Sequence, residues 1–220
     1  MPESGELSKQ NVYRIGDTAD KNRIRAGFPV VHASFPGYNS SMIQSVKVQK
    51  PFKDYREFKR LYDASFPDNE RIPFLRLYTQ MDETRVFYAY YEKEKLIGLS
   101  FFYLLDDLAY LSYLAVEEKL RGQGYGSKIL QRIKEDYRDC RIVLDIEEVK
   151  EDAGNYEERR KRKDFYLHNG FVSAGIFYHI YHVDYEILVA NGTACKEDWH
   201  RIISRYWGKF ADNAVYKEKR

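Results

Sequence analysis

The sequence predicts an α+β fold, a mixed α/β arrangement in which helices are layered on a sheet. Three strand-like runs follow one another over residues 84–116 with only short polar turns between them, which predicts an antiparallel meander. Helix-like and strand-like runs then alternate, which predicts crossover helices packed on the same sheet. No segment repeats along the 220 residues, so the order of these elements defines the fold.

The first 41 residues differ from the rest of the chain. Gly, Pro and Ser are scattered through residues 1–41, and apolar residues keep no period there apart from FPVVHASF. We therefore expect an irregular leader or extension, followed by a single domain over residues 42–220. One hypothesis is that the native chain starts at Met42; the alternative is an ordered arm or a tail that binds a partner.

One strand and two helices are predicted before the meander. SVKVQK, residues 45–50, alternates as a short strand does. YREFKRLYDASF, residues 55–66, carries apolar or aromatic side chains at helical spacing. Residues 67–69 stop this helix and are able to cap a second one, ERIPFLRLYTQMD, residues 70–82.

Aromatic and β-branched residues mark the three meander strands. The runs are TRVFYAYYEKE (84–94), KLIGLSFFYLLD (95–106) and LAYLSYLAV (108–116), with turns at Glu94–Lys95 and Asp106–Asp107. The third run is apolar on both faces, so we expect a central strand that is covered on both sides. Most of the 20 tyrosines lie in strand-like runs, which suggests half-buried sheets and a tyrosine-lined cleft.

Helices and strands alternate in the second half of the chain. Helices are predicted over 127–137, within 151–170 and over 196–213, and strands over 141–148, 171–180 and 181–190. Asn155 suits the N-cap of the middle helix, and Gly170 suits the C′ position after it.

Composition narrows the class of protein. Charged residues make up 32% of the chain but the formal net charge is only +2, so no overall field indicates a nucleic-acid binder. The basic run at 159–163 lies beside acidic residues at helical spacing, which favours a solvated helix face. Two cysteines cannot form a disulfide framework, and no secretory signal or membrane-length apolar run is visible, so we expect a reduced, cytoplasmic setting without a membrane partner.

A glycine-rich turn, RGQGYG at residues 121–126, separates the third meander strand from the next helix. Glycine leaves the backbone uncovered where the first helical N–H groups lack internal partners and carry the positive end of the helix dipole. An anion is able to approach such groups, and Arg121 adds a charge suited to phosphate oxygens. The spacing matches neither the dinucleotide fingerprint GxGxxG nor the P-loop GxxxxGK[ST]. We interpret the segment as a diphosphate site, with a plain flexible turn as the alternative.

Two motifs resemble those of the Gcn5-related N-acetyltransferase (GNAT) superfamily. RGQGYG resembles its R/Q-x-x-G-x-G/A signature, whose backbone amides bind the pyrophosphate of acetyl-coenzyme A. FYLHNGF, residues 165–171, resembles its FYxxxGF segment, and the two motifs stand in the family's order. The resemblance covers roughly residues 45–191. It implies a mixed, mostly antiparallel sheet in which the strand at 111–116 splays from a parallel strand at 141–148.

The resemblance also implies a donor and its binding residues. Acetyl-coenzyme A would be the donor substrate, a primary amine the acceptor, and no metal would take part. Pantetheine would lie between the splayed strands and pair with backbone groups of Leu114, Ala115 and Val116. We assign the other donor contacts to the loop, the start of its helix and the start of the next one. These residues are Arg121, Gly122, Gln123, Gly124, Tyr125, Gly126, Ser127 and Asn155.

Acetyl transfer requires a neutral amine, a polarised thioester carbonyl and a proton for the leaving thiolate. The resemblance places Tyr166 at the coenzyme sulfur, as the general acid. Many relatives carry a glutamate base early in the fourth strand, but residues 109–112 hold no carboxylate here. We therefore assign the base to Glu147 or Glu148, acting through a water, with solvated strand-end charges as the alternative.

The remaining expectations concern the acceptor. Asp145 alternates with Glu147, so this strand end has an acidic face that would attract a cationic amine. His179 and His182 lack a Cys, Asp or Glu that would complete a tetrahedral zinc set, but they could line the acceptor pocket. Tyrosines of the helix pair at 55–82 and of the last hairpin are expected to shape that pocket.

The function expected on these grounds is a bacterial-type N-acetyltransferase that acts by direct transfer in a ternary complex, on a small-molecule or protein amine. A non-catalytic acyl-coenzyme A sensor on the same fold is one alternative, and a protein N-terminal or lysine acetyltransferase is another. The aromatic hairpin at 171–190 could join two chains in a homodimer.

Overall fold

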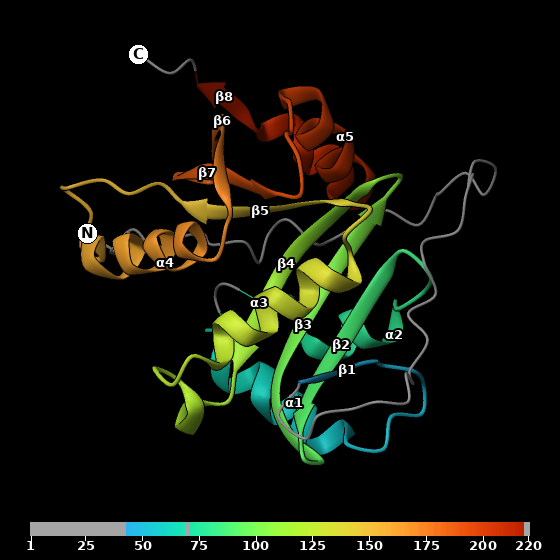
Figure 1. The fold of residues 1–220 in the computed structure, drawn as a ribbon. Coiled ribbons are helices and arrows are strands. Elements are labelled where there is room, and N and C mark those ends of the chain that lie inside the picture. Colours follow the sequence, from blue (N-terminus) through green and yellow to red (C-terminus); the bar gives the residue numbers. More distant parts are fainter. Residues whose placement is uncertain (1–42, 69–70, 218–220) are drawn as a thin grey trace, which may run out of the picture.

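A computed structural model describes residues 43–68 and 71–217 of the protein (Figure 1). Its strands are β1 (Gln44–Lys47), β2 (Arg85–Glu92), β3 (Lys95–Leu105), β4 (Leu108–Val116), β5 (Arg141–Glu147), β6 (Val172–Ile180), β7 (Val183–Ala190) and β8 (Val215–Lys217). Its helices are α1 (Tyr55–Ser65), α2 (Phe74–Thr79), α3 (Tyr125–Asp136), α4 (Tyr156–His168) and α5 (Lys196–Trp207), with 3₁₀ segments at Glu118–Leu120 and Gly208–Asn213. The predicted order of elements is confirmed from β1 to α5.

The strands form one mixed sheet in the order β1-β2-β3-β4-β5-β7-β6-β8. β1 to β4 pair antiparallel, which confirms the meander. β4 and β5 are the parallel pair, and the strands beyond β5 pair antiparallel again. The α+β class with a mostly antiparallel sheet is therefore confirmed.

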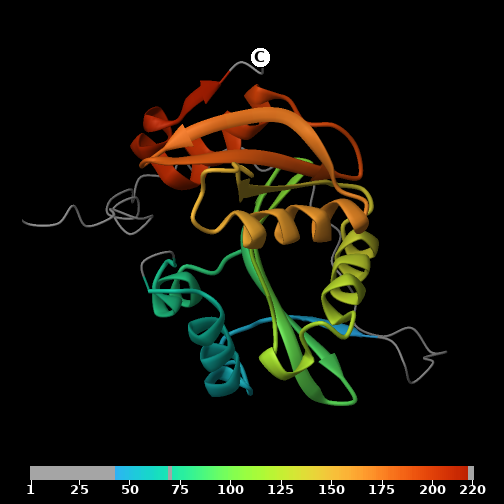
Figure 2. The same cartoon turned by 90° about the vertical axis from the view of Figure 1, so that its left-hand side faces the viewer.

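Helices cover both faces of this sheet (Figure 2). α1, α2 and α5 bury their apolar sides in one hydrophobic core, and α3 buries its apolar side in a second core that also receives aromatic side chains of α4. α5 packs in this way because its apolar side chains recur at helical spacing on one side. These side chains, all buried, are Trp199, Ile202, Ile203 and Trp207. β4, at the centre, contributes residues to both cores, as its two apolar faces predicted.

β4 and β5 separate soon after they meet. Their pairing is confined to residues 108–110 of β4 and 141–143 of β5. Just beyond, Phe101 of β3 faces Tyr113 while Phe102 faces Leu111, so Ser112 is an extra residue in β4. Such a bulge bends the strand and increases its twist, which directs the rest of β4 away from β5. The predicted splay is confirmed; the bulge was not predicted.

Several boundaries differ from the sequence prediction. α2 has six residues, because Pro73 precedes it and cannot continue a hydrogen-bonded helix from the N-terminal side. The turn between β2 and β3 lies at Lys93–Glu94, one residue earlier than predicted, where both residues have positive φ. α3 begins at Tyr125 rather than Ser127. β8 was not predicted, and it pairs with β6 over residues 177–179, so part of the edge proposed for a homodimer is already occupied.

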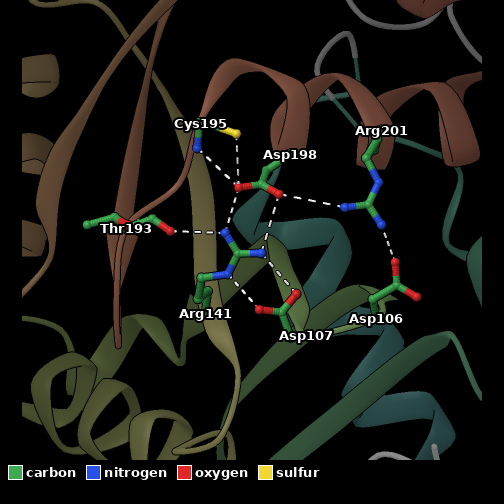
Figure 3. Close-up of polar contacts among 7 residues, drawn as sticks. All are labelled: Asp106, Asp107, Arg141, Thr193, Cys195, Asp198 and Arg201. Carbon is green, nitrogen blue, oxygen red and sulfur yellow. Dashed lines mark hydrogen bonds and ion pairs between the residues drawn. The ribbon is translucent and has the colours of Figure 1, made fainter. Parts of the chain in front are cut away.

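A network of charged side chains attaches the start of α5 to the sheet (Figure 3). Arg141 of β5 donates to both carboxylate oxygens of Asp107, with Nε–Oδ2 at 2.7 Å and Nη2–Oδ1 at 2.9 Å. The same guanidinium binds Asp198 of α5 through Nη1 at 2.5 Å and the carbonyl of Thr193 at 3.1 Å. Asp198 also accepts from the backbone N–H of Cys195, and so caps its helix. We refer to Asp107, Arg141 and Asp198 as the α5 clamp.

The α5 clamp predicts that folding stability falls in acid. Arg141 lowers the pKa of Asp198 to about 2, and it also lowers the pKa of Asp107. A carboxyl group with a lowered folded-state pKa stabilises the fold above its unfolded pKa, and this contribution is lost as pH falls through the folded value. As pH falls from about 4 to about 2, we expect the contribution of Asp198 to the free energy of unfolding to decrease by roughly 1–2 kcal/mol. Urea titrations of wild type and Asp198→Asn at both pH values would measure this, and an equal acid loss in the two proteins would contradict it.

Some predictions fall on residues that are not described. The leader at 1–41, the possible start at Met42 and the residue at position 69 in the second cap lie outside the described ranges, and the division into leader and single domain stays a prediction. Within residues 43–68 and 71–217, no helix combines the length and apolar character needed to cross a bilayer.

Candidate functional site

A cleft of about 1530 Å³ opens where β4 and β5 separate. Its walls come from the ends of β4 and β5, the glycine-rich loop, α4 with the turn before it, the end of α1, and the β6–β7 turn. The gap predicted between the splayed strands is therefore a cavity, and the two sequence motifs both contribute to its lining.

The glycine-rich loop leaves backbone N–H groups without partners beside this cleft. Gly122 and Gly124 have φ of 72° and 81°, in the left-handed region that favours glycine, and Gly124 is the N-cap of α3. Among the described residues, no N–H group from 122 to 127 has an acceptor. No atom lies within 4 Å of where a Cβ would stand on either glycine. An anion therefore has access to the positive end of the α3 dipole.

Gly126 serves packing rather than turning. A Cβ at this position would lie 3.0 Å from the ring of Phe165, so the absence of a side chain lets α4 approach the first turn of α3. The three glycines of the loop therefore have two different physical roles, two for backbone conformation and one for close contact between helices.

The other loop residues differ in where their side chains lie. Arg121 borders the cleft and donates to the carbonyl of Val116 at 3.2 Å and to the hydroxyl of Ser65 at 3.3 Å. Ser127 also borders the cleft. Gln123 donates instead to the carbonyl of Lys119, and Tyr125 to the carboxylate of Glu92. The roles predicted for Gln123 and Tyr125 therefore depend on their backbone N–H groups.

Leu114, Ala115 and Val116 form the β4 wall of the cleft, together with Ser112 at the bulge. β3 pairs with one edge of this segment, whereas β5 leaves the other edge after residue 110. An extended ligand with amide groups would find a strand edge there.

Tyr166 of α4 lines the cleft, and its ring packs against Phe165 and Phe171 with centroids 5.2 and 5.5 Å away. Burial raises the pKa of its hydroxyl to about 12; Arg162 opposes the change and Asp145 adds to it. No hydrogen-bond partner for this hydroxyl appears among the described residues. Tyr166 therefore stays protonated at neutral pH, as a proton donor must.

Glu147 ends β5 beside the cleft, and its carboxylate is already paired. Arg159 lies 3.1 Å from Oε1 and Arg162 lies 3.3 Å from Oε2. Asn155 stands at the N-cap of α4 as predicted but makes no capping hydrogen bond; its amide lies 3.4 Å from Glu147 Oε2. The carboxylate of Glu147 is thus paired with two cations, and its role as the base stays a prediction.

Glu148 is not part of the cleft lining. Its Oε2 lies 3.5 Å from Lys217 Nζ of β8 and 3.9 Å from Lys150 Nζ. The structure thus places this carboxylate beside two lysines, and the base role of Glu148 stays a prediction.

Asp145 is a carboxylate to which the sequence analysis assigned no catalytic role. It lines the cleft, where the hydroxyl of Tyr110 donates to Oδ1 at 2.7 Å and that of Tyr178 donates to Oδ2 at 3.0 Å. Tyr110 lies in the stretch of β4 where a base glutamate was sought, and it reaches across the parallel pair to β5. Alternation along β5 predicted that Asp145 lies on the acidic face. Its partners belong to β4 and β6, and they are 35 and 33 residues away along the chain.

The residues predicted to shape an acceptor pocket lie only partly in the cleft lining. Tyr181, His182 and Tyr185 of the last hairpin line the cleft, as expected. The helix pair contributes no tyrosine to the lining; Tyr62, for example, is buried in the core and donates to the carbonyl of Ile72. That part of the prediction was wrong, because helical spacing turns these tyrosines toward the sheet. The end of α1 contributes instead through Ser65, Phe66 and Pro67.

The ring of His179 lies 6.5 Å from that of His182, but His179 is not part of the cleft lining. Its Nδ1 lies 2.6 Å from Oδ1 of Asp184. Across the described ranges, no three His, Cys, Asp or Glu side chains gather closely enough to hold a metal ion.

Comparison with known proteins follows these observations. A family model described as acetyltransferase (GNAT) domain matches residues 82–173, a range that contains both motifs, the splayed strands and Asp145. α5 and β8 lie beyond it. No curated protein matches the chain.

Solved structures of GNAT enzymes have the same fold. A putative GNAT-family acetyltransferase from Bacteroides thetaiotaomicron matches with a TM-score of 0.57 and 22% identity, over 70% of this chain and 92% of that one. The ribosomal-protein-S18-alanine N-acetyltransferase from Escherichia coli matches with a TM-score of 0.53 and 15% identity, over 71% and 98%. A putative GNAT acetyltransferase from Desulfovibrio desulfuricans matches with a TM-score of 0.51 and 15% identity, over 67% of this chain and 98% of that one. At these identities the likeness concerns the fold alone.

Proposed function

Residues 82–173 match the model of the GNAT acetyltransferase domain, and from that match we propose that this chain transfers an acetyl group from acetyl-coenzyme A to a primary amine. Both substrates bind together, and the acetyl group passes directly between them. One observation carries the proposal: a single cleft joins the uncovered loop N–H groups, the gap between β4 and β5, and the hydroxyl-bearing ring of Tyr166.

Acetyl-coenzyme A fits this cleft with its pyrophosphate at the loop N–H groups and its thioester at Tyr166. The loop N–H groups hold the pyrophosphate at the start of α3, and Arg121 adds a charge beside them. Pantetheine extends along residues 114–116 and takes the strand edge that β5 leaves. This route brings the thioester toward Tyr166, whose protonated hydroxyl donates to the departing sulfur.

Direct transfer is also supported by the cysteines, which are the side chains best suited to carry an acetyl group. Cys140 is buried outside the cleft lining, and burial raises the pKa of its thiol, which disfavours the nucleophilic thiolate. Cys195 is exposed at the start of α5 and also lies outside the lining. Neither thiol is placed to form an acetyl-enzyme.

Replacing Gly124 by Val is expected to weaken acetyl-coenzyme A binding about tenfold or more, because a β-branched side chain is strained at φ 81° and would cover the N–H groups. Calorimetric titration with acetyl-coenzyme A measures this. Gly208→Val is the matched control, since Gly208 has φ 58° at the end of α5, outside the cleft lining. An equal loss of affinity in both variants would indicate general misfolding rather than a loop contact.

The function itself is tested by measuring how much free thiol acetyl-coenzyme A releases in the presence of each amine of a panel. Acetyl-coenzyme A binding together with amine-dependent release of free thiol supports the enzyme. Binding without release on any amine would favour the alternative, an acyl-coenzyme A sensor. Release only with peptides would assign the acceptor to protein amines, at an N-terminus or a lysine.

A further inference from the structure

Asp145 accepts hydrogen bonds in the cleft from the hydroxyls of Tyr110 and Tyr178. Its situation differs from that of Glu147, whose carboxylate faces two arginines. Asp145 also lies close enough to Tyr166 for its charge to raise the pKa of that phenol, in addition to the larger effect of burial. Both the carboxylate and the phenol line the cleft.

Both tyrosine rings rest on one tryptophan of α5. The Trp199 ring lies edge-on to Tyr110 with centroids 5.0 Å apart, and 5.6 Å from the ring of Tyr178. Trp199 is 1% exposed, and Tyr110 and Tyr178 are equally enclosed. Close packing leaves such rings little freedom, so the position of Trp199 fixes where the two hydroxyls point.

The position of Trp199 is fixed in turn by the α5 clamp. Trp199 directly follows Asp198, whose carboxylate binds Arg141 and caps the helix (Figure 3). A continuous chain of contacts thus leads from the sheet through Arg141 and the start of α5 to Trp199, then through two tyrosine rings to Asp145. The helix in this chain lies outside the matched acetyltransferase domain.

We propose that Asp145 binds the ammonium group of the acceptor and takes its first proton, and that α5 positions Asp145 through Trp199, Tyr110 and Tyr178. This inference rests on the proposed function and deepens it, because it restricts the acceptor to amines that arrive as cations. Trp199 is a positioning residue in this scheme, since it touches neither substrate, and Asp145 is the residue in contact with the acceptor.

The proton and bond changes balance as follows. The ammonium gives one proton to Asp145, and the neutral nitrogen forms a bond to the acetyl carbon. The carbon–sulfur bond breaks, and the sulfur takes the proton of the Tyr166 hydroxyl. The acylated nitrogen loses its second proton, which restores Tyr166 through solvent, and Asp145 releases its proton to bulk water. One amide, one free thiol and one proton result from one ammonium and one thioester.

The test begins with binding and turnover of the wild-type chain. Acetyl-coenzyme A is titrated by calorimetry, and thiol release is followed with n-propylamine, 2-phenylethylamine, spermidine and an alanine-initiated peptide. Absence of donor binding would contradict the proposed function itself. Donor binding without turnover on any of these amines would favour the acyl-coenzyme A sensor, and so would contradict the proposed function together with the present inference.

Asp145→Asn then separates charge from shape, because the two side chains are nearly isosteric. We expect kcat/KM for the active amine to fall about 100-fold, with the Kd for acetyl-coenzyme A changed less than about twofold. Unchanged kcat/KM in Asp145→Asn, with the donor bound normally, would overturn the inference and leave the proposed function standing.

A double-mutant cycle tests the positioning role. Trp199→Leu is expected to lower kcat/KM about tenfold in the wild-type background and less than about twofold in the Asp145→Asn background, because its effect passes through Asp145. Ile202→Ala is the control, since it opens a cavity in the same buried side of α5 and should lower Tm with kcat/KM nearly unchanged. Trp199→Phe replaces Trp199→Leu if the latter does not fold. Additive effects of Trp199 and Asp145 would refute the positioning role.

Discussion

Replacing Tyr166 by Phe is expected to lower kcat about 100-fold and to leave the Kd for acetyl-coenzyme A unchanged, because in the proposed mechanism the phenol supplies a proton and not a binding contact. Burial keeps this hydroxyl protonated by raising its pKa to about 12, and the ring stays packed against Phe165 and Phe171 in the variant. Steady-state kinetics with a saturating amine give kcat, and calorimetry gives the donor Kd.

Tyr137→Phe provides the matched control for this variant. It removes one hydroxyl from a buried ring at the C-cap of α3, outside the cleft lining. In the wild type this hydroxyl lies 3.3 Å from that of Tyr88. Its kcat should change less than about twofold. Equal values of kcat for wild type and Tyr166→Phe would remove the general-acid role, whereas a loss of donor affinity would reassign Tyr166 to binding.

Replacing Arg141 by Ala is expected to destabilise the fold by about 2–4 kcal/mol, since it removes the nearer of the two cations beside Asp198. Asp198 is only 13% exposed, and Arg141 also binds Asp107 and the carbonyl of Thr193. Urea titration measures the free energy of unfolding. The proposal that α5 positions Asp145 adds a second expectation, that kcat/KM for the amine falls while acetyl-coenzyme A still binds.

Arg201→Ala is the control from the same network. Arg201 binds Asp106 and lies 3.7 Å from Asp198, but it is 50% exposed, so its ion pairs are screened by solvent. Its loss should cost less than about 1 kcal/mol. Equal stability losses for Arg141→Ala and Arg201→Ala would show that the α5 clamp contributes no more than an ordinary surface pair.

Local features of the site were predictable from the sequence. The glycines at 122 and 124 adopt positive φ at the start of a helix, as the spacing indicated, and the strands on either side separate as the family resemblance implied. These features depend on a few adjacent residues. The bulge at Ser112 was not predictable in the same way, because it is a property of the register between β3 and β4 and not of either strand alone.

The choice among carboxylates shows where sequence reasoning ends. Alternation correctly placed Asp145 and Glu147 on one side of β5. What distinguishes them is their partners, arginines of α4 for Glu147 and tyrosines of β4 and β6 for Asp145, and these partners are more than ten residues away along the chain. β8 escaped prediction for a related reason, since three residues carry no period and gain their strand geometry by pairing with β6.

The most direct test of the account compares acetyl-coenzyme A with S-acetylpantetheine, which carries the same thioester but no phosphate. If the loop N–H groups hold the pyrophosphate, calorimetry should show acetyl-coenzyme A binding at least about 100-fold more tightly. Equal affinities for the two thioesters, or no heat with acetyl-coenzyme A, would contradict the central claim.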